Sequence, residues 1–445
     1  MFGFRFLGNT RIPHNKNTND LAPVRITPPA EVLLPVDQHI GAPAVPVVKV
    51  GDEVKVGQLV AKASGYISAN IHSSVSGKVT KIDDCLKFSG RTVPAIRIEN
   101  DGLMTPYEDI KAPEITDIDS FVNAIADSGI VGLGGAGFPT SVKFDAIKKG
   151  GIHTIIVNAA ECEPYITSDA RTMLDHPDLV FEGISLIQRI APTVKRYIIG
   201  IEKNKPTCIA NMTEIFAGDD SVKVVSLPTL YPQGAEKTIT HNTTGLVVPE
   251  GKLPSDIGVL VVNVSTVAQI ASYAKTGMPL VERCVTVDGS AISTPANVIV
   301  PIGTSINDVL EFVGGTSGNV GKVIMGGPMT GRTAYSLSEP IIKTSNAIVV
   351  LTEKESRGLK VSDCIHCGKC IDACPNHLNP TGFTKALSIE DMDERMSKLE
   401  ELSVTMCMEC GCCAFVCPAN RPLINNIRLS KNSLREYKAH KATLK

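Results

Sequence analysis

Two cysteine runs near the C-terminal end narrow the possible folds and chemistry of this chain. "CIHCGKCIDACP" begins at Cys364 and "CMECGCCAFVCP" begins at Cys407, and both follow the spacing C-x2-C-x2-C-x3-C-P. This spacing is typical of proteins that hold two [4Fe-4S] clusters, where the fourth cysteine of each run binds the cluster of the other run. Two copies of the pattern in one segment argue against a chance match.

The spacing divides the predicted ligands between two clusters. The first cluster takes Cys364, Cys367, Cys370 and Cys417, and the second takes Cys407, Cys410, Cys413 and Cys374. Cys412 is left over, and either packs or tunes its neighbouring cluster through a weak S–H contact. Structural zinc is the competing hypothesis, but zinc favours two separated C-x2-C pairs. Met392, Met396 and Leu399 repeat at helical spacing between the runs, which predicts a largely helical cluster domain.

Composition excludes several other classes of protein. The chain has 445 residues, enough for about three domains. Its 44 basic and 46 acidic side chains nearly cancel, so we expect no nucleic-acid partner. The first residues do not resemble a signal peptide, and no uncharged apolar run reaches the length of a membrane span. We therefore expect a cytosolic protein whose clustered cysteines bind metal.

The N-terminal region contains a predicted all-β segment. "VGDEVKVGQLV" (50–60) and "HSSVSGKV" (72–79) resemble the biotinyl/lipoyl barrel-sandwich domain, over about residues 40–85. In the carrier proteins of that family, a lysine at the hairpin tip holds the prosthetic group. Tyr66 stands at that position here. The resemblance therefore implies a structural or docking role and not a carrier function.

The middle of the chain alternates between strand-like and helix-like patterns. Asp178 to Arg189 carries apolar residues on one helical face. Buried parallel strands are predicted at 154–159, 196–201, 222–227 and 259–264. This alternation predicts a three-layer α/β domain with its ligand site at the strand ends. A DG turn, a proline break and one short helix then predict a small β-grasp module in 284–330.

Two loops of the α/β region are candidate ligand contacts. "VGLGGAGFPTSVKF" (131–144) is rich in glycine, which lets the backbone approach a phosphate or flat ring, and a helix is predicted from about Thr140. A plain turn is the alternative for this loop alone. Asn158, Glu161 and Glu163 follow a predicted strand end, where a ligand should bind.

These loops carry a family resemblance. "GLGGAGFPTSVK" followed by "NAAECEP" resembles the flavin-bearing NADH dehydrogenase subunit of respiratory complex I. The whole chain resembles the C-subunit family of the Rnf complex, a membrane-associated ferredoxin:NAD oxidoreductase. The resemblance implies a multidomain α/β protein with a barrel-sandwich, a flavin domain, a soluble-ligand-binding (SLBB) β-grasp and a two-cluster ferredoxin domain. The expected boundaries are 1–112, 113–280, 281–355 and 356–430, followed by a basic tail at 431–445.

The resemblance also implies roles for single residues. Gly132, Gly134, Gly135, Ala136 and Gly137 would wrap FMN and the dinucleotide, with Phe138 facing adenine and Lys143 near flavin or phosphate. Asn158 would bond the flavin beside Glu161, and Glu163 would act as the catalytic residue against flavin and nicotinamide. Tyr231, Gly234 and Glu236 would lie at the flavin edge, and Asn263 and Thr266 near its phosphate. Leu133, Ala146, Ala160 and Ala235 depart from the complex I pattern, which puts NADH contacts in doubt more than FMN contacts.

The implied function is electron transfer between NAD(H), FMN and two [4Fe-4S] clusters. A flavin exchanges a hydride with NADH and single electrons with clusters. In the Rnf family, other subunits link this chain to ferredoxin and pump sodium ions or protons, which implies a peripheral place on the cytoplasmic side of the membrane.

Two rival hypotheses are a soluble cobalamin reductase, whose modules come in another order, and an electron-transfer adaptor without a nucleotide site. The basic tail would face an acidic partner or anionic membrane, or be disordered.

Overall fold

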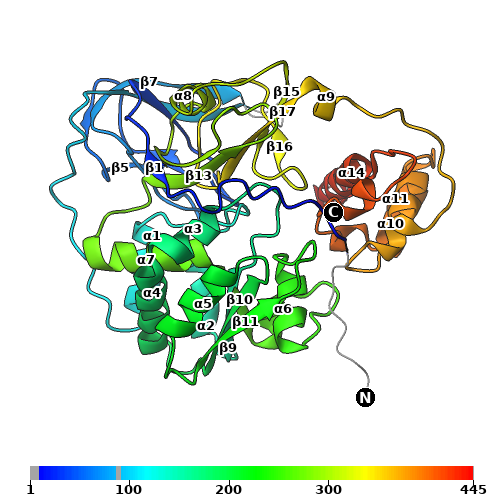
Figure 1. Cartoon of the computed structure of the whole chain (residues 1–445), viewed down its shortest axis with the longest axis horizontal. Coiled ribbons are helices and arrows are strands. Elements are labelled where there is room, and N and C mark those ends of the chain that lie inside the picture. The colour runs from blue at the N-terminus through cyan, green and yellow to red at the C-terminus, as the bar shows by residue number, and fades with distance from the viewer. Residues whose placement is uncertain (1–9, 87–91, 444–445) are drawn as a thin grey trace.

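The computed structural model describes residues 10–86 and 92–443. Figure 1 shows two β-rich units side by side, the α/β domain below them, and a separate helical domain joined through a long linker after helix α9 (Glu353–Ser356). This arrangement agrees with the predicted multidomain α/β class. The cysteine runs lie in the helical domain, which faces the carboxyl ends of the α/β sheet.

The α/β domain is built on a four-stranded parallel sheet in the order β11-β10-β9-β12. The strands are β9 (Thr154–Ala159), β10 (Arg196–Glu202), β11 (Val222–Leu227) and β12 (Val259–Asn263), which confirms all four predicted strands. Alternate residues of β9 enter two different cores, with Ile155 on one face and Ile156 on the other. Because both faces are covered, the interior strands β9, β10 and β12 are mostly apolar, whereas the edge strand β11 also carries exposed polar residues.

Helices form the outer layers of this domain. On one face lie α3 (Ser168–Asp175), α4 (Pro177–Ile190), α5 (Pro206–Ile215) and α7 (Val264–Thr276), and α1 (Ile118–Asp127) and α2 (Thr140–Lys148) pack into the same core. The other face is covered by α6 (Glu236–Thr244), through Ile239. Strand β9 lies between β10 and β12, so the chain order reverses there. A reversal of this kind positions ligands at the strand ends.

The N-terminal β unit extends on both sides of the predicted range 40–85. One sheet runs β2-β8-β7-β4 and a second runs β3-β5-β6. The strands are β2 (Glu31–Pro35), β3 (Val45–Pro46), β4 (Glu53–Val54), β5 (Leu59–Lys62), β6 (Ile71–His72), β7 (Gly77–Leu86) and β8 (Thr92–Asn100). Tyr66 lies in the β5–β6 hairpin, and its hydroxyl donates to Asp145 Oδ2 of α2 at 2.6 Å. The tyrosine therefore joins this unit to the α/β domain.

The β-grasp unit includes a strand that sequence patterns did not indicate. Its sheet runs β1-β14-β13-β17-β15-β16, with α8 (Ile306–Phe312) packed into its core. The strands are β13 (Glu282–Asp288), β14 (Ala296–Pro301), β15 (Val320–Met325), β16 (Arg332–Thr333) and β17 (Ala347–Thr352). The added strand, β1 (Val24–Arg25), lies parallel to β14 and comes from the N-terminal region. Residues 10–26, here called the N-terminal strap, cross between the upper units and the α/β domain (Figure 1).

The cluster domain is helical, as predicted. Its helices are α10 (Lys369–Asp372), α11 (Pro380–Ala386), α12 (Met392–Glu401), α13 (Cys412–Phe415) and α14 (Leu423–Thr443). Helix α14 continues to Thr443 and so includes most of the segment expected as a basic tail. Leu434 is buried in the domain core with Leu399, and Lys438 pairs with Glu400 at 2.6 Å. The basic segment that begins at residue 431 is therefore bound in part by a carboxylate of the cluster domain itself.

Candidate functional site

Two adjoining cavities open at the carboxyl ends of β9 and β12. The smaller has a volume of about 240 Å³ and the larger about 680 Å³. Both are lined by Gly134, Glu163 and Thr330, so they form one continuous site. The predicted residues that line one cavity or both are Gly134, Gly135, Ala136, Asn158, Glu161, Glu163, Tyr231, Gly234 and Asn263. Asn158 and Asn263 are paired in the β9–β12 register, which sets their amides side by side.

Other predicted residues lie behind the cavity walls. These are Gly132, Gly137, Phe138, Lys143, Glu236 and Thr266. Lys143 Nζ pairs with Glu236 Oε1 at 2.6 Å and donates to the carbonyl of Val261 at 2.8 Å. Thr266 Oγ1 accepts the N–H of Leu133 at 3.0 Å, so it supports the glycine loop. Direct cofactor contacts by these six residues stay predictions.

The glycine loop is held by close backbone approaches. A Cβ at Gly137, where φ is +69°, would lie 2.5 Å from Thr344 Cγ2 of the β-grasp unit. A Cβ at Gly134 would lie 3.2 Å from the amide of Asn263. Side chains at these positions would push the loop from its neighbours. The glycines therefore leave a cradle whose exposed wall is backbone, which suits a flat ring or a phosphate.

Glu163 is held by a second glycine-rich loop that the sequence reasoning missed. Its carboxylate accepts the N–H of Met329 at 3.1 Å and of Thr330 at 2.9 Å, and the Thr330 hydroxyl also donates to it. Burial raises the pKa of Glu163, while these donors oppose the shift. A Cβ at Gly327 would lie 2.3 Å from Glu163 Oε2. The repeated glycines of "GGPMTG" (326–331) were the available signal.

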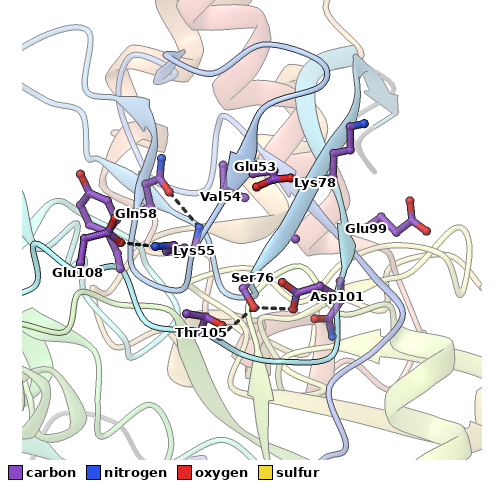
Figure 2. Close-up of a pocket in the computed structure, with 13 residues that line it drawn as sticks. Glu53, Val54, Lys55, Gln58, Ser76, Lys78, Glu99, Asp101, Thr105 and Glu108 are labelled. Carbon is purple, nitrogen blue, oxygen red and sulfur yellow. Dashed lines mark hydrogen bonds and ion pairs between the residues drawn. The ribbon is translucent and has the colours of Figure 1, made fainter.

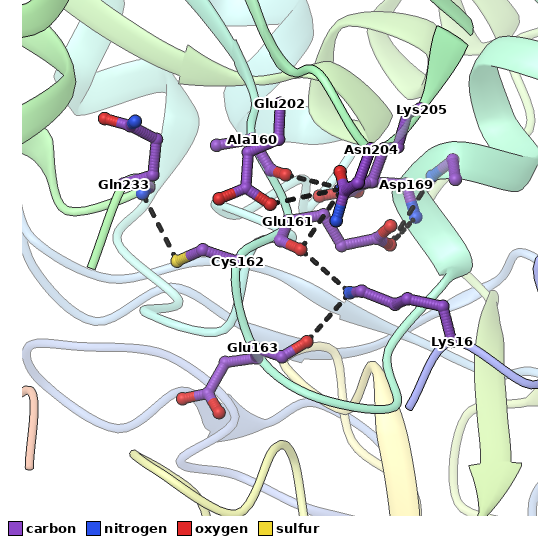
Figure 3. Close-up of polar contacts among 12 residues, drawn as sticks. Lys16, Ala160, Glu161, Cys162, Glu163, Asp169, Glu202, Asn204, Lys205 and Gln233 are labelled. Atoms are coloured by element: carbon purple, nitrogen blue, oxygen red, sulfur yellow. Dashed lines mark hydrogen bonds and ion pairs between the residues drawn. The ribbon is translucent and has the colours of Figure 1, made fainter. Parts of the chain in front are cut away.

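A buried lysine of the N-terminal strap fixes the acidic loop from behind. Lys16 Nζ donates to the carbonyls of Glu161 and Glu163 at 2.8 Å each, and to that of Ile166 at 2.5 Å. Figure 3 shows the Glu163 carboxylate pointing away from Lys16, so the lysine holds the backbone and not that side chain. Burial lowers the pKa of Lys16 to about 8, and the Glu161 carboxylate opposes this. Sequence reasoning missed Lys16 because lysines are rarely buried.

Glu161 lines the smaller cavity and is anchored through one of its two carboxylate oxygens. Its Oε1 accepts the N–H of Asp169 at 2.6 Å, at the start of α3. Its Oε2 is buried and has no hydrogen-bond partner within the described part of the chain. Burial raises the pKa of Glu161 to about 7. An unpaired buried oxygen is costly when charged, and the raised pKa of Glu161 reflects this cost because protonation removes the buried charge.

Tyr231 joins this site to the cluster domain. Its hydroxyl donates to the carbonyl of Cys410 at 2.8 Å, and Glu163 Oε1 lies 3.5 Å from the same oxygen. Cys410 itself lines the smaller cavity. Cys412 is 1 % exposed and packs with Tyr231 and Ile12 at this junction, so it is placed between the two domains.

The predicted cluster ligands form two groups in space. Cys364, Cys367, Cys370 and Cys417 line one cavity of about 120 Å³. Burial and the nearby thiols of Cys407, Cys410 and Cys374 raise the pKa of Cys413 to about 12. Within the described residues, no three His, Cys, Asp or Glu side chains converge as closely as a single metal ion requires. Cysteines spread around a cavity fit the wider cage of a four-iron cluster.

A further cavity, of about 610 Å³, lies in the N-terminal β unit (Figure 2). Its polar side chains pair with one another: Lys55 with Glu108 at 2.6 Å, and Ser76 with Asp101 at 2.7 Å. The described residues that line it include none of the predicted site residues. This cavity is therefore separate from the candidate site.

Family models match three parts of the chain. Residues 4–103 match the RnfC barrel sandwich hybrid domain, residues 125–272 the Nuo51 FMN-binding domain, and residues 363–421 the 4Fe-4S dicluster domain. These matches confirm the predicted barrel-sandwich, flavin and two-cluster domains, with FMN and [4Fe-4S] clusters as cofactors. Among the described residues, no helix is long and apolar enough to cross a bilayer.

A solved structure supports the fold. The NAD+-reducing [NiFe]-hydrogenase in its H2-reduced state superposes with a TM-score of 0.51 at 18 % identity, over 72 % of this chain and 62 % of that one. At this identity the likeness concerns the fold alone.

Three curated relatives are much more similar. The C subunit of the proton-translocating ferredoxin:NAD(+) oxidoreductase complex of Clostridium ljungdahlii is 43 % identical, over 84 % of this chain and 83 % of the relative. The C subunit of the Na(+)-translocating complex of Acetobacterium woodii is 40 % identical, over 96 % and 97 %. The C subunit of the ion-translocating oxidoreductase complex of Rhodobacter capsulatus is 38 % identical, over 93 % and 80 %. The chain therefore belongs to the family of C subunits of ion-translocating ferredoxin:NAD(+) oxidoreductase complexes.

Proposed function

We propose that this chain passes electrons between NAD(H) and two [4Fe-4S] clusters through FMN, as the NAD-linked subunit of an ion-translocating complex. The observation that carries the proposal is the smaller cavity, lined by the predicted flavin residues Asn158 and Asn263 and also by Cys410, a predicted cluster ligand. A two-electron and a one-electron centre would therefore be neighbours. When bound there, FMN supplies the exchange between hydride and single-electron chemistry.

The residues of the chain position and shield this chemistry. Asn158 donates to the carbonyl of Gly234 at 2.8 Å, which fixes the end of β9. Glu163 stands where the two cavities meet, on the path from a dinucleotide in one to a flavin in the other. Tyr231 and Met408 cover the side toward the cluster domain. We assign Glu163 the role of orienting the nicotinamide, with no proton transfer.

The partners follow from family membership. We propose that the other subunits of the complex deliver or receive the electrons, with ferredoxin reached through a partner iron–sulfur subunit. The side chains around the first cluster support an outward-facing contact, because Ile365 is 66 % exposed and Cys367 is exposed. We further propose a peripheral place on the cytoplasmic side of the membrane.

Glu163→Gln tests the dehydrogenase function. The N–H groups of Met329 and Thr330 donate to different oxygens of Glu163, so the glutamine keeps an acceptor for one of them and removes the charge. We expect kcat/KM for NADH oxidation with an artificial acceptor to fall about 10- to 100-fold, the range of one hydrogen bond to a charged group. The measurement uses anaerobically purified protein with assayed iron and flavin. Glu182→Gln, at an exposed carboxylate that pairs with Lys275, is the control and should retain native rates.

One result would remove the proposal altogether. If the native protein carries FMN and both clusters but does not oxidise NADH, the chain is an electron-transfer adaptor. Iron and flavin contents equal to native in Glu163→Gln are required before any rate is interpreted.

A further inference from the structure

The larger cavity has walls from three different domains. The α/β domain contributes the glycine loop at Gly134 to Ala136, the β-grasp unit contributes Gly326 to Arg332, and the cluster domain contributes Met408, Glu409, Arg428 and Asn432. Its volume of about 680 Å³ lies in the range of small-molecule and cofactor sites. The smaller cavity at the strand ends would be filled by FMN. The larger one is therefore the space left for the dinucleotide.

The cations of this cavity come from outside the α/β domain. Among its described lining residues, Arg332 and Arg428 are the positively charged ones. Arg332 pairs with Glu339, which is 5 % exposed, so that pair is close to neutral. Lys143, expected near a phosphate, lies behind the wall in its pair with Glu236. Binding of a doubly charged diphosphate must therefore draw on the cluster-domain side.

Arg428 is oriented for this role by a charge cluster that Arg428 and Lys431 of α14 form with Glu409 of the second cysteine run. Its Nε donates to Glu409 Oε2 at 3.0 Å, and Lys431 binds the other oxygen of Glu409 at 2.5 Å. Two cations share one carboxylate, so the rim has a net positive charge. No hydrogen bond joins the terminal nitrogens of Arg428 to another described residue. A guanidinium fixed through Nε presents these two nitrogens as a fork that matches phosphate oxygens.

The adenine contact implied by the complex I resemblance does not reach this cavity. Phe138 is not among its lining residues, and the described lining residues include no aromatic side chain. Apolar surface comes instead from Ile166 of the α/β domain, from Met325 and Ile342 of the β-grasp unit and from Met408 of the cluster domain. Residues after position 320 therefore contribute much of the wall that would face the second half of the dinucleotide.

On the basis of the proposed function, we propose that Arg428 binds the diphosphate of NAD(H), so that the cluster domain completes the substrate site. Arg428 is a binding residue outside the FMN-binding domain. The β-grasp loop forms the facing wall. Dinucleotide binding then depends on the docked position of the cluster domain, and Phe138 is dispensable for it.

The test compares ligands with and without the diphosphate, on the holoprotein. ADP-ribose has the adenosine diphosphate and no nicotinamide, so its binding reports the diphosphate contact without hydride chemistry. In Arg428→Gln we expect the Kd of ADP-ribose, by titration calorimetry, and the KM of NADH to rise about 10- to 100-fold, with kcat within about twofold of native. Reduced nicotinamide mononucleotide lacks the diphosphate bridge, and its KM should change less than about threefold.

Three further variants complete the design. Lys438→Gln also removes one positive charge from α14, at a residue paired with Glu400, and should bind ADP-ribose as the native protein does. Arg428→Lys should recover part of the affinity. Phe138→Ala should leave the Kd unchanged. Native affinity in Arg428→Gln, or a large loss confined to Phe138→Ala, would overturn the proposal.

The experiment distinguishes a wrong assignment of Arg428 from a wrong proposed function. A native protein that neither oxidises NADH nor binds ADP-ribose contradicts the function itself and removes this proposal with it. A native protein that does both, with Arg428→Gln unchanged, contradicts only the assignment of Arg428. Iron and flavin contents equal to native in Arg428→Gln show that the substitution leaves the clusters and the flavin in place.

Discussion

Cys413→Ala is expected to remove one cluster and to stop electrons from reaching the other. The protein should retain about four irons per chain in place of about eight, because one of two [4Fe-4S] clusters loses a ligand. NADH should still bleach the flavin absorbance, since the cavities at β9 and β12 do not include Cys413. The first cluster, detected by EPR after NADH addition, should stay oxidised because the cluster nearest the flavin is missing.

The neighbouring cysteine is the matched control for this experiment. Cys412→Ala changes the adjacent side chain of the same helix, α13, but removes a sulfur that packs with Tyr231 and Ile12. It should keep about eight irons and the reduction of both clusters. Iron loss in Cys412→Ala equal to that in Cys413→Ala would mean that the ligand assignment is wrong.

Lys16→Met is expected to loosen the flavin site without touching it. The substitution leaves three carbonyls of the acidic loop without their shared donor and removes a positive charge near Glu161. A buried polar group that loses its hydrogen-bond partner costs about 1–3 kcal/mol. We expect a lower thermal midpoint in scanning fluorimetry and loss of FMN during gel filtration, although no described strap residue lines either cavity.

An exposed lysine provides the comparison. Lys275→Met breaks the pair with Glu182 on the surface of the same domain, and pairs of this kind contribute about 0–1 kcal/mol. Lys275→Met should keep its flavin and its thermal midpoint. If Lys16→Met does the same, the acidic loop is held by other contacts, such as the bond from Lys205 to the carbonyl of Ala160.

The sequence predicted those elements of the fold in which the local pattern of apolar residues matches the pattern of buried positions. The strands β9, β10 and β12 are buried on both faces, so each is a short apolar run, and α4 has a regular apolar face. The β1 strand has only two residues, Val24 and Arg25, and its place depends on β14 far along the chain. No periodicity can indicate such a pairing.

In the candidate site, too, the residues predicted from sequence are those placed by local pattern, and the residues missed are those placed by contacts between domains. Residues at the strand ends, such as Asn158, were predicted because parallel strands place their carboxyl ends together. Lys143 and Glu236 were assigned to the cofactor, yet each is the other's ion-pair partner in this structure. Lys16 and Arg428 were missed because their roles depend on which domain packs against which. A single sequence does not report that packing.

The N-terminal strap also bears on the order in which the chain folds. Thr18 and Asn297 share a hydrogen bond although 279 positions separate them. During synthesis the strap leaves the ribosome early, but its last partners emerge only with the β-grasp unit. Contacts of such long sequence separation form slowly, after the individual domains. We therefore expect stable FMN loading to wait until the nascent chain has passed the β-grasp unit, which makes cofactor insertion a late step in the maturation of this protein.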